Sequence, residues 1–455
     1  MKFNYSNKLA LVFAISIVVL NSILSNATEI SSYPGMNPQF SSRLTATLNQ
    51  SIKEWKNLWL TQNVRSEDYL NKVLGPKISS EEKEKLVEST IQLKEVAEFD
   101  CNNKELRPAK LPEFCTNKES WLQQAGFNQF AMTLKIPLQN VVKMNDPKVI
   151  KMLQDFVSNA KILDPKIDEA GIFQASRNVW IAATLQKILN VDVQLTSPLY
   201  GYSMLYPYTD NVFDDPNLAK EAKGKFAKKF GSMLLGKNIE LSSDLEIKVL
   251  ENVNRMYDTF SPSQYPDVKQ AVLSIYYGQM ESMRQRDPSL SAEEILWISA
   301  FKGGTSVLAD SYLAKPVLSE KEFQVSFDFG FLLQMVDDLQ DLEKDQNEGF
   351  NSRTVFHNPK LDKKMRTEQV IQLVDYSHFI IKRLNELYPN NEELTQTMDA
   401  FIQLIIFEAV AQQPDQFDDK LVSEIEARSS LSFDNLSKAE IEKNMYQMIQ
   451  RIDLK

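Results

Sequence analysis

The sequence has 455 residues, enough for one large domain or for a core domain with a smaller partner. Its apolar and charged fractions, 43% and 25%, are those of globular proteins and argue against a disordered chain. The formal net charge of −10 argues against nucleic acid as a partner, although a polyanion could still bind through divalent cations. Glycine is scarce, with 13 residues, and short alternating runs are missing, so the chain is predicted to be all-α.

The first 27 residues are predicted to be a secretory signal peptide. Lys2 and Lys8 precede an apolar run over residues 9–24, and small residues at 25–27 offer a cleavage site. The alternative is an uncleaved membrane anchor, for which the run is somewhat short. The protein is therefore expected to be exported, or associated with a membrane through its N-terminus.

Residues 28–145 are predicted to form a helical N-terminal region interrupted by a loop that contains both cysteines. Cys101 and Cys115 could form one disulfide in an exported protein, and without a nearby histidine they make a poor zinc site. The chain has only two histidines, His357 and His378, so histidine-based catalysis or metal binding is not expected.

Helices are predicted to continue through a main domain over residues 146–430 and a C-terminal amphipathic helix within 431–455. A further helix begins near Pro266, where apolar residues recur at helical spacing. Several helix starts are marked by a Ser followed three residues later by Glu, the pattern of a capping box. These pairs are Ser79/Glu82, Ser243/Glu246, Ser291/Glu294, Ser319/Glu322 and Ser437/Glu440.

Two acidic segments stand out in the main domain. On a helix, Asp210 and Asp214 lie one turn apart on the same face, and their mutual repulsion would be relieved by a cation. The alternative for this pair is a solvated helix end. In the second segment Asp337, Asp341 and Asp345 share a face that continues from an apolar helix. Such a row is typical of a cavity wall, where carboxylates hold Mg²⁺ together with substrate phosphates; its alternative is a helix that emerges into water.

These segments carry a resemblance to a known enzyme family. Asp337-Asp338-Leu-Gln-Asp341, preceded by Gln334, resembles the second aspartate-rich motif of polyprenyl diphosphate synthases. The stretch over 205–216 is similar to that of a bacterial group of class I isoprenoid biosynthesis enzymes, and so are those over 277–283, 302–310 and 337–349. The resemblance covers about residues 165 to 360.

The resemblance implies the class I isoprenoid synthase bundle, here with the extra helical N-terminal region, and a Mg²⁺ cofactor. Asp210, Asp214, Asp337 and Asp341 are implied as the catalytic metal ligands. Asp215, Asp338 and Asp345 are implied as further ligands. Lys302, Arg177, Arg284 and Gln334 are implied as contacts to the substrate diphosphate. Gly303 and Gly304 should weaken their helix by roughly 1–2 kcal/mol relative to alanine, and we expect them to mark a break that lines the site.

Departures from the family indicate which reaction to expect. The Arg-Arg-Gly that follows the first motif of chain-elongating enzymes is missing, and so is their upstream Gly-Gly-Lys-Arg. A single diphosphate site favours a terpene synthase that cyclises or eliminates one prenyl diphosphate. The alternatives are a prenyltransferase that uses isopentenyl diphosphate, with lysines of 220–229 at the second site, and an exported, non-catalytic protein that binds metal or lipid. Related bundles often dimerise, so a monomer and a homodimer both stay open.

Overall fold

The computed structural model describes residues 29–61, 77, 79, 81, 147–215, 217–342, 353–357 and 361–428. All regular elements within these ranges are helices and none is a strand, which confirms the predicted all-α class. The predicted signal peptide, both cysteines, Asp345 and the C-terminal helix lie outside the described residues.

The longer helices are α2 (Pro38–Thr61), α7 (Pro147–Leu163), α8 (Glu169–Ile188), α9 (Ser197–Asp214), α10 (Lys220–Leu234), α11 (Asp244–Asp258), α12 (Pro266–Ser282), α13 (Ala292–Ala314), α14 (Glu320–Gln340), α16 (Lys363–Leu387), α17 (Glu392–Ala411) and α18 (Asp419–Glu426). From α7 to α14, and again from α16 to α18, the helices follow one another with short connections, as expected for neighbouring helices in a bundle. Short 3₁₀ helices are η1 (Ile30–Ser32), η4 (Met283–Arg286) and η5 (Pro414–Gln416).

Helix starts agree with the capping signals where these are described. Complete capping boxes begin α13 at Ser291 and α14 at Ser319. At the start of α11 the Ser243 hydroxyl accepts from the Glu246 backbone N–H, but the Glu246 carboxylate instead accepts from Lys229 and the backbone N–H of Ser242. The two outermost predicted boxes, at 79/82 and 437/440, include residues outside the described ranges.

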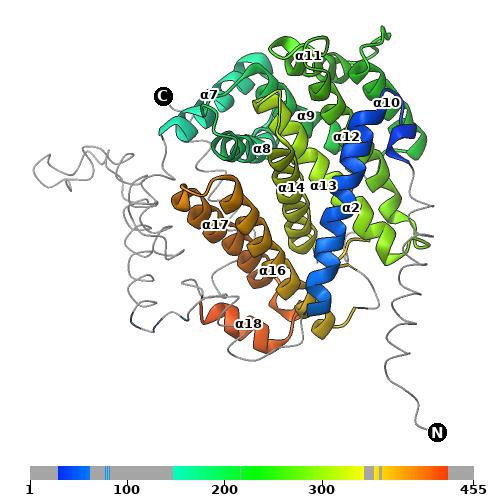
Figure 1. Cartoon of the computed structure of the whole chain (residues 1–455). Helices are drawn as coiled ribbons and strands as arrows, with labels where there is room; N and C mark the ends of the chain where they lie inside the picture. The colour runs from blue at the N-terminus through cyan, green and yellow to red at the C-terminus, as the bar shows by residue number, and fades with distance from the viewer. Residues whose placement is uncertain are drawn as a thin grey trace, which may run out of the picture.

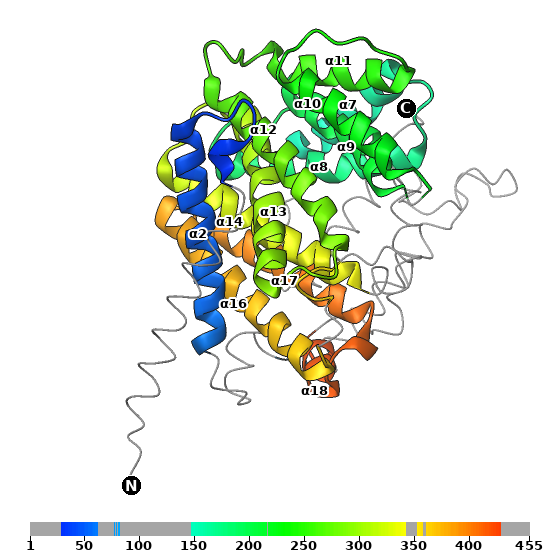
Figure 2. The same cartoon turned by 90° about the vertical axis from the view of Figure 1, so that its right-hand side faces the viewer.

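The bundle is built around α13 and α14, which are antiparallel and buried on nearly all faces. Helix α12 packs on α13, and α8 and α9 pack on each other and on α13. In both views α7 to α11 gather towards one end of the molecule and α16 to α18 towards the other (Figures 1 and 2).

Helix α2 belongs to the same core, although the sequence assigns it to a separate N-terminal region. It runs beside α13 in Figures 1 and 2 and contacts α13, α14 and α16. The Phe40 ring lies 5.8 Å from that of Phe323, and the Trp55 ring lies 5.9 Å from that of Phe331. Both of these α2 side chains are buried, so the N-terminal region contributes at least this helix to the core.

The glycine pair of α13 does not break its helix, contrary to the expectation from sequence. Helix α13 is continuous through Gly303 and Gly304, and the pair lies against α14. A Cβ on Gly303 would lie 2.6 Å from the carbonyl oxygen of Gly330, and a Cβ on Gly330 would lie 2.2 Å from the carbonyl oxygen of Gly303. The glycines therefore allow α13 and α14 to approach closely, and the burial that this permits outweighs the propensity cost.

One helix segment among the described residues, Leu394–Ala411 of α17, is long and apolar enough to span a membrane by length and composition alone. Part of it is buried inside the bundle, and a core helix of a soluble protein passes the same test.

Candidate functional site

Polar side chains of α8, α9, α13 and α14 face one another inside the bundle. On α13 they recur every three or four residues and so share one face of that helix. That polar face consists of Ser299, Lys302, Ser306 and Asp310. Most of the other side chains of α13 are apolar and packed, so this face indicates where a polar site lies in the interior.

Arg177 of α8 and Asp337 of α14 form the central contact of the site. The Arg177 Nη2 atom lies 3.5 Å from Asp337 Oδ1, across 160 residues of sequence. Both side chains are substantially exposed, by 59% and 44%. The resemblance implied one of these residues for diphosphate and the other for metal, and they are neighbours at a place that solvent and ligands reach.

Asp338, the next residue, faces the interior instead. Its carboxylate accepts from Ser299 Oγ at 2.9 Å and from Gln334 Nε2 at 2.8 Å, one bond to each oxygen. Burial raises the pKa of Asp338 to about 6, and the charge of Asp337 adds to this, whereas the two hydrogen bonds and the charge of Lys302 oppose it. Because both oxygens already have donors, the geometry favours a positioning role for Asp338 over a role as metal ligand.

Helix α14 ends at Gln340, so Asp341 already lies just beyond the helix that carries Asp337, while Asp345 is outside the described residues. Asp341 is the C-cap residue, and its backbone N–H donates to the carbonyl oxygen of Asp337 at 3.0 Å. A row of aspartates at the C-terminus of a helix is unfavourable with the helix dipole, which is a physical reason for the helix to stop here.

The first acidic segment is helical, as predicted, up to Asp214, the last residue of α9. Asp210 is half-buried, and its Oδ1 accepts from the Thr209 hydroxyl at 3.4 Å. Asp215 is the C-cap, and its Oδ1 accepts from the backbone N–H of Asn217 at 2.8 Å. Asp215 thus ends the helix, while the Asp214 side chain is not among those described.

Lys223 of α10 is a residue of this region that sequence reasoning missed. Its side chain is buried, and its Nζ donates to the carbonyl oxygen of Phe213 at 2.6 Å, at the C-terminus of α9. A lysine at this place neutralises the negative end of the helix beside the acidic segment. The only signal in the sequence was the run of lysines from 220 to 229.

The ion pairs described for Arg284 are with glutamates rather than with the aspartates. Its guanidinium lies 2.6 Å from Glu281 and 3.6 Å from Glu294, at the junction between α12 and α13. These partners hold its charge locally, so of the two predicted arginines the geometry favours Arg177 for the site.

A second polar group, also missed from sequence, lies deeper in the bundle. Asn178 of α8 donates through Nδ2 to Ser203 Oγ at 3.1 Å and to Asp310 Oδ1 at 3.0 Å. Asp310 is fully buried, and this burial raises its pKa well above the usual range. Consecutive residues of α8 therefore contact two carboxylates: Arg177 reaches Asp337, and Asn178 reaches Asp310. Asp310 ends the 302–310 stretch singled out above, which was its only signal.

The described residues contain no group of three or more His, Cys, Asp or Glu side chains close enough to hold a metal ion together. The exposed carboxylate of Asp337 and the half-buried one of Asp210 are hard oxygen donors of the type Mg²⁺ prefers. Of the predicted metal ligands, two are not covered by the described residues: the side chain of Asp214 and the whole of Asp345.

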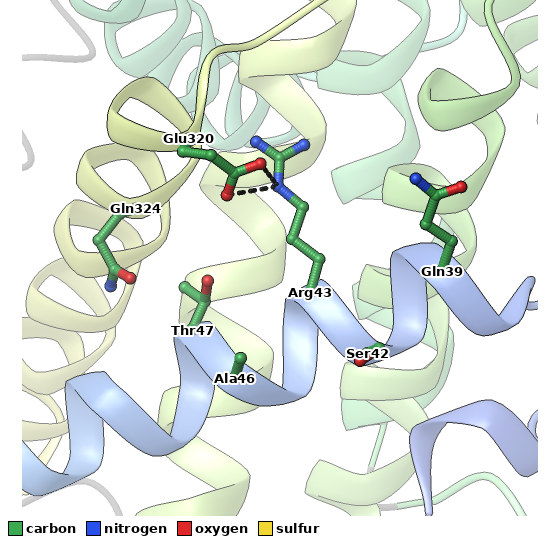
Figure 3. Close-up of a pocket in the computed structure, with 7 residues that line it drawn as sticks. All are labelled: Gln39, Ser42, Arg43, Ala46, Thr47, Glu320 and Gln324. Atoms are coloured by element: carbon green, nitrogen blue, oxygen red, sulfur yellow. Dashed lines mark hydrogen bonds and ion pairs between the residues drawn. The ribbon is translucent and has the colours of Figure 1, made fainter.

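A surface pocket of about 570 Å³ lies elsewhere, between α2 and the start of α14. Figure 3 shows Arg43 of α2 reaching across it to Glu320, with Gln39, Thr47 and Gln324 along its sides. Gln324 and Asp337 are separated along α14 by about 20 Å at 1.5 Å per residue. This pocket is therefore distinct from the region of the aspartates.

Comparisons with known proteins add no relative: no protein-family model matches the chain, and no curated protein matches it. Function is therefore inferred from the residues and contacts described above.

Proposed function

We propose that the protein is a Mg²⁺-dependent class I terpene synthase that ionises a prenyl diphosphate and then cyclises the allylic cation or eliminates a proton from it. The observation that carries this proposal is the Arg177–Asp337 contact. It joins a cationic side chain suited to a diphosphate and an acidic side chain suited to a metal, from helices far apart in the sequence.

The surroundings of that contact support the proposal. Lys302 on α13 is close enough to lower the pKa of Asp338, so a third charged group of the predicted set belongs to the same neighbourhood. The all-α bundle places these groups on α8, α13 and α14 around an apolar and aromatic interior. In the proposal, apolar and aromatic side chains of this kind would contact the hydrocarbon chain and exclude water from a reactive cation.

The chain's own residues have separable roles in this proposal. Asp337 and Asp341, with Asp210 and Asp214, would hold the metal, which when bound neutralises the leaving diphosphate. Arg177 binds the diphosphate by paired N–H donors, and Lys302 contributes a point charge. Asp338 positions the Gln334 and Ser299 side chains through the hydrogen bonds that its carboxylate accepts from them.

Chain elongation is less well supported. It needs a second diphosphate site, for which the lysines of 220–229 were the remaining candidates. Two of them have structural partners: Lys223 caps α9, and Lys229 binds Glu246 at 2.8 Å. A prenyltransferase would turn over only when isopentenyl diphosphate is added.

The test is diphosphate release by purified protein from C10, C15 and C20 prenyl diphosphates with Mg²⁺, with and without isopentenyl diphosphate. We expect release without the co-substrate, and its loss in the Asp337→Ala/Asp341→Ala variant. The matched control is Asp192→Ala, which removes an exposed carboxylate in the connection between α8 and α9. If no substrate releases diphosphate under either condition, the proposal fails and the exported, non-catalytic alternative becomes the better one.

A further inference from the structure

The buried polar group of Asn178, Ser203 and Asp310 has unsatisfied hydrogen-bonding capacity. Asn178 Oδ1 and Asp310 Oδ2 are both shielded from solvent and have no hydrogen-bond partner among the described residues. Each such atom left unpaired in an interior destabilises the fold, because it has lost its hydrogen bonds to water. Because the two side chains already touch through Asn178 Nδ2 and Asp310 Oδ1, their unpaired atoms belong to one small site.

The charge of the site restricts what it can bind. Burial raises the pKa of Asp310 and so favours its uncharged form, while the hydrogen bond from the Asn178 amide opposes this. The titratable groups that face it from α9 are the Tyr202 and Tyr206 hydroxyls, whose own pKa values are raised by burial. Among the described residues no ion pair involves Asp310, so the surroundings favour neither a cation nor an anion.

An uncharged hydroxyl group matches the two unpaired atoms. A protonated Asp310 Oδ2 donates a hydrogen bond, whereas Asn178 Oδ1 only accepts one. A hydroxyl does both: it accepts from Asp310 and donates to Asn178. We propose that Asn178 and Asp310 form a buried binding site for a single uncharged hydroxyl, that of a water molecule or that of an alcohol bound within the bundle.

The alternative in which an alcohol supplies the hydroxyl rests on the proposed function. A prenyl alcohol forms when water captures the allylic cation in place of elimination. In that step water's oxygen bonds to the cationic carbon, and the proton it loses passes to the released diphosphate. Asn178 directly follows Arg177 in α8, so the proposed hydroxyl and diphosphate sites involve the same turn of one helix, through a buried and an exposed side chain that point in different directions.

The first test is a high-resolution crystal structure of the full chain, alone and with farnesol. We expect an oxygen atom within hydrogen-bond distance of both Asn178 Oδ1 and Asp310 Oδ2, either a water that persists or the farnesol hydroxyl in its place. The proposal is overturned if no oxygen contacts both atoms in either crystal, for example because the two side chains bond directly to each other.

The second test separates the two sources by comparing farnesol with farnesene, which lacks the hydroxyl. If the alcohol occupies the site, wild type binds farnesol about tenfold more tightly than farnesene, and Asn178→Leu/Asp310→Leu removes this difference. Equal binding, with the water present in the crystal, assigns the site to water. Ser311→Ala is the matched control, because it removes a neighbouring buried hydroxyl that bonds only to the carbonyl oxygen of Val307 in its own helix. Diphosphate release is measured separately, so loss of the hydroxyl site and loss of the proposed reaction are distinguished.

Discussion

Asp337 and Asp338 are adjacent in sequence, but their carboxylates meet different surroundings. Asp337 is exposed beside a guanidinium, whereas Asp338 is buried and accepts two neutral hydrogen bonds. The resemblance to aspartate-rich motifs implied both as metal ligands, because a motif indicates which residues act together but not which neighbours surround each of them in this chain.

The raised pKa of Asp338 predicts a pH-dependent stability. Its folded-state pKa of about 6 lies above its usual value of 3.8, so the folded state holds this proton more tightly than the unfolded chain does. The stability that this provides is present at low pH and is lost as the pH rises from about 4 to about 6, by roughly 3 kcal/mol.

The Asp338→Asn variant has no carboxyl group at this position, so its stability lacks this pH dependence. We therefore expect the unfolding free energy of wild type to fall relative to Asp338→Asn between about pH 4 and pH 7, measured by urea denaturation in chelator. A difference that stays constant over this range would contradict the buried geometry.

Arg177 and Arg284 provide a matched pair of arginines for testing the site. Arg177→Ala should lower kcat/KM for diphosphate release by about 10- to 100-fold, because it removes charge-assisted hydrogen bonds to the substrate. Arg284→Ala should leave kcat/KM within about threefold, since its partners are Glu281 and Glu294 rather than the aspartates. A larger effect at Arg284 than at Arg177 would reverse the assignment made here.

At the scale of elements, α13 and α14 cross closely because glycines lie at their contact. From their low helix propensity alone, the glycines of α13 were expected to break that helix. Gly303 and Gly330 meet backbone to backbone, so any Cβ there pushes the two helices apart. That separation would also move Ser299 and Lys302 away from the α14 carboxylates. The motif containing the glycines was visible in the sequence, but its partner helix was not, and the expected break was therefore wrong.

Gly303→Ala should destabilise the fold by about 1–3 kcal/mol through overpacking. Gly224→Ala is the matched control: this glycine lies within α10, and a Cβ there would meet no atom within 4 Å. With no contact to disturb, the alanine should stabilise α10 by about 0.5–1 kcal/mol. Thermal unfolding of the two variants should therefore shift in opposite directions. Equal shifts would mean that α13 and α14 are not in backbone contact.

At the scale of the whole molecule, the sequence predicted individual helices better than it predicted which helices contact one another. Apolar periodicity and capping residues predicted the all-α class and the starts of α12, α13 and α14, because these depend on neighbours within one or two turns. The Arg177–Asp337 contact and the docking of α2 depend on residues far apart in the chain. Periodicity carries no information about such pairs, and for the site only the ordered aspartate motifs indicated that distant segments share a function.

The docking of α2 converges on Asp328, a fully buried carboxylate of α14. It accepts hydrogen bonds from Ser51 of α2, from Tyr376 of α16 and from Gln324 of its own helix, and it forms an ion pair with Arg383 of α16. Burial raises the pKa of Asp328, and the Arg383 charge opposes this. One side chain therefore connects three helices, and the ion pair compensates its charge.

Removing one partner of this buried pair should be far more harmful than removing both. Asp328→Ala leaves Arg383 without its partner and should cost about 3–5 kcal/mol of unfolding free energy. Asp328→Leu/Arg383→Met should recover most of that loss, because no buried charge remains uncompensated. The exposed pair of Lys148 and Asp192 is the comparison, and Asp192→Ala should cost no more than about 1 kcal/mol. Amide exchange in α2 should rise in Asp328→Ala, since Ser51 then loses its hydrogen bond to α14. If α2 exchange and stability are both unchanged, Asp328 does not hold α2 to the bundle, and the docking of this helix depends on its aromatic contacts with α14 and α16 instead.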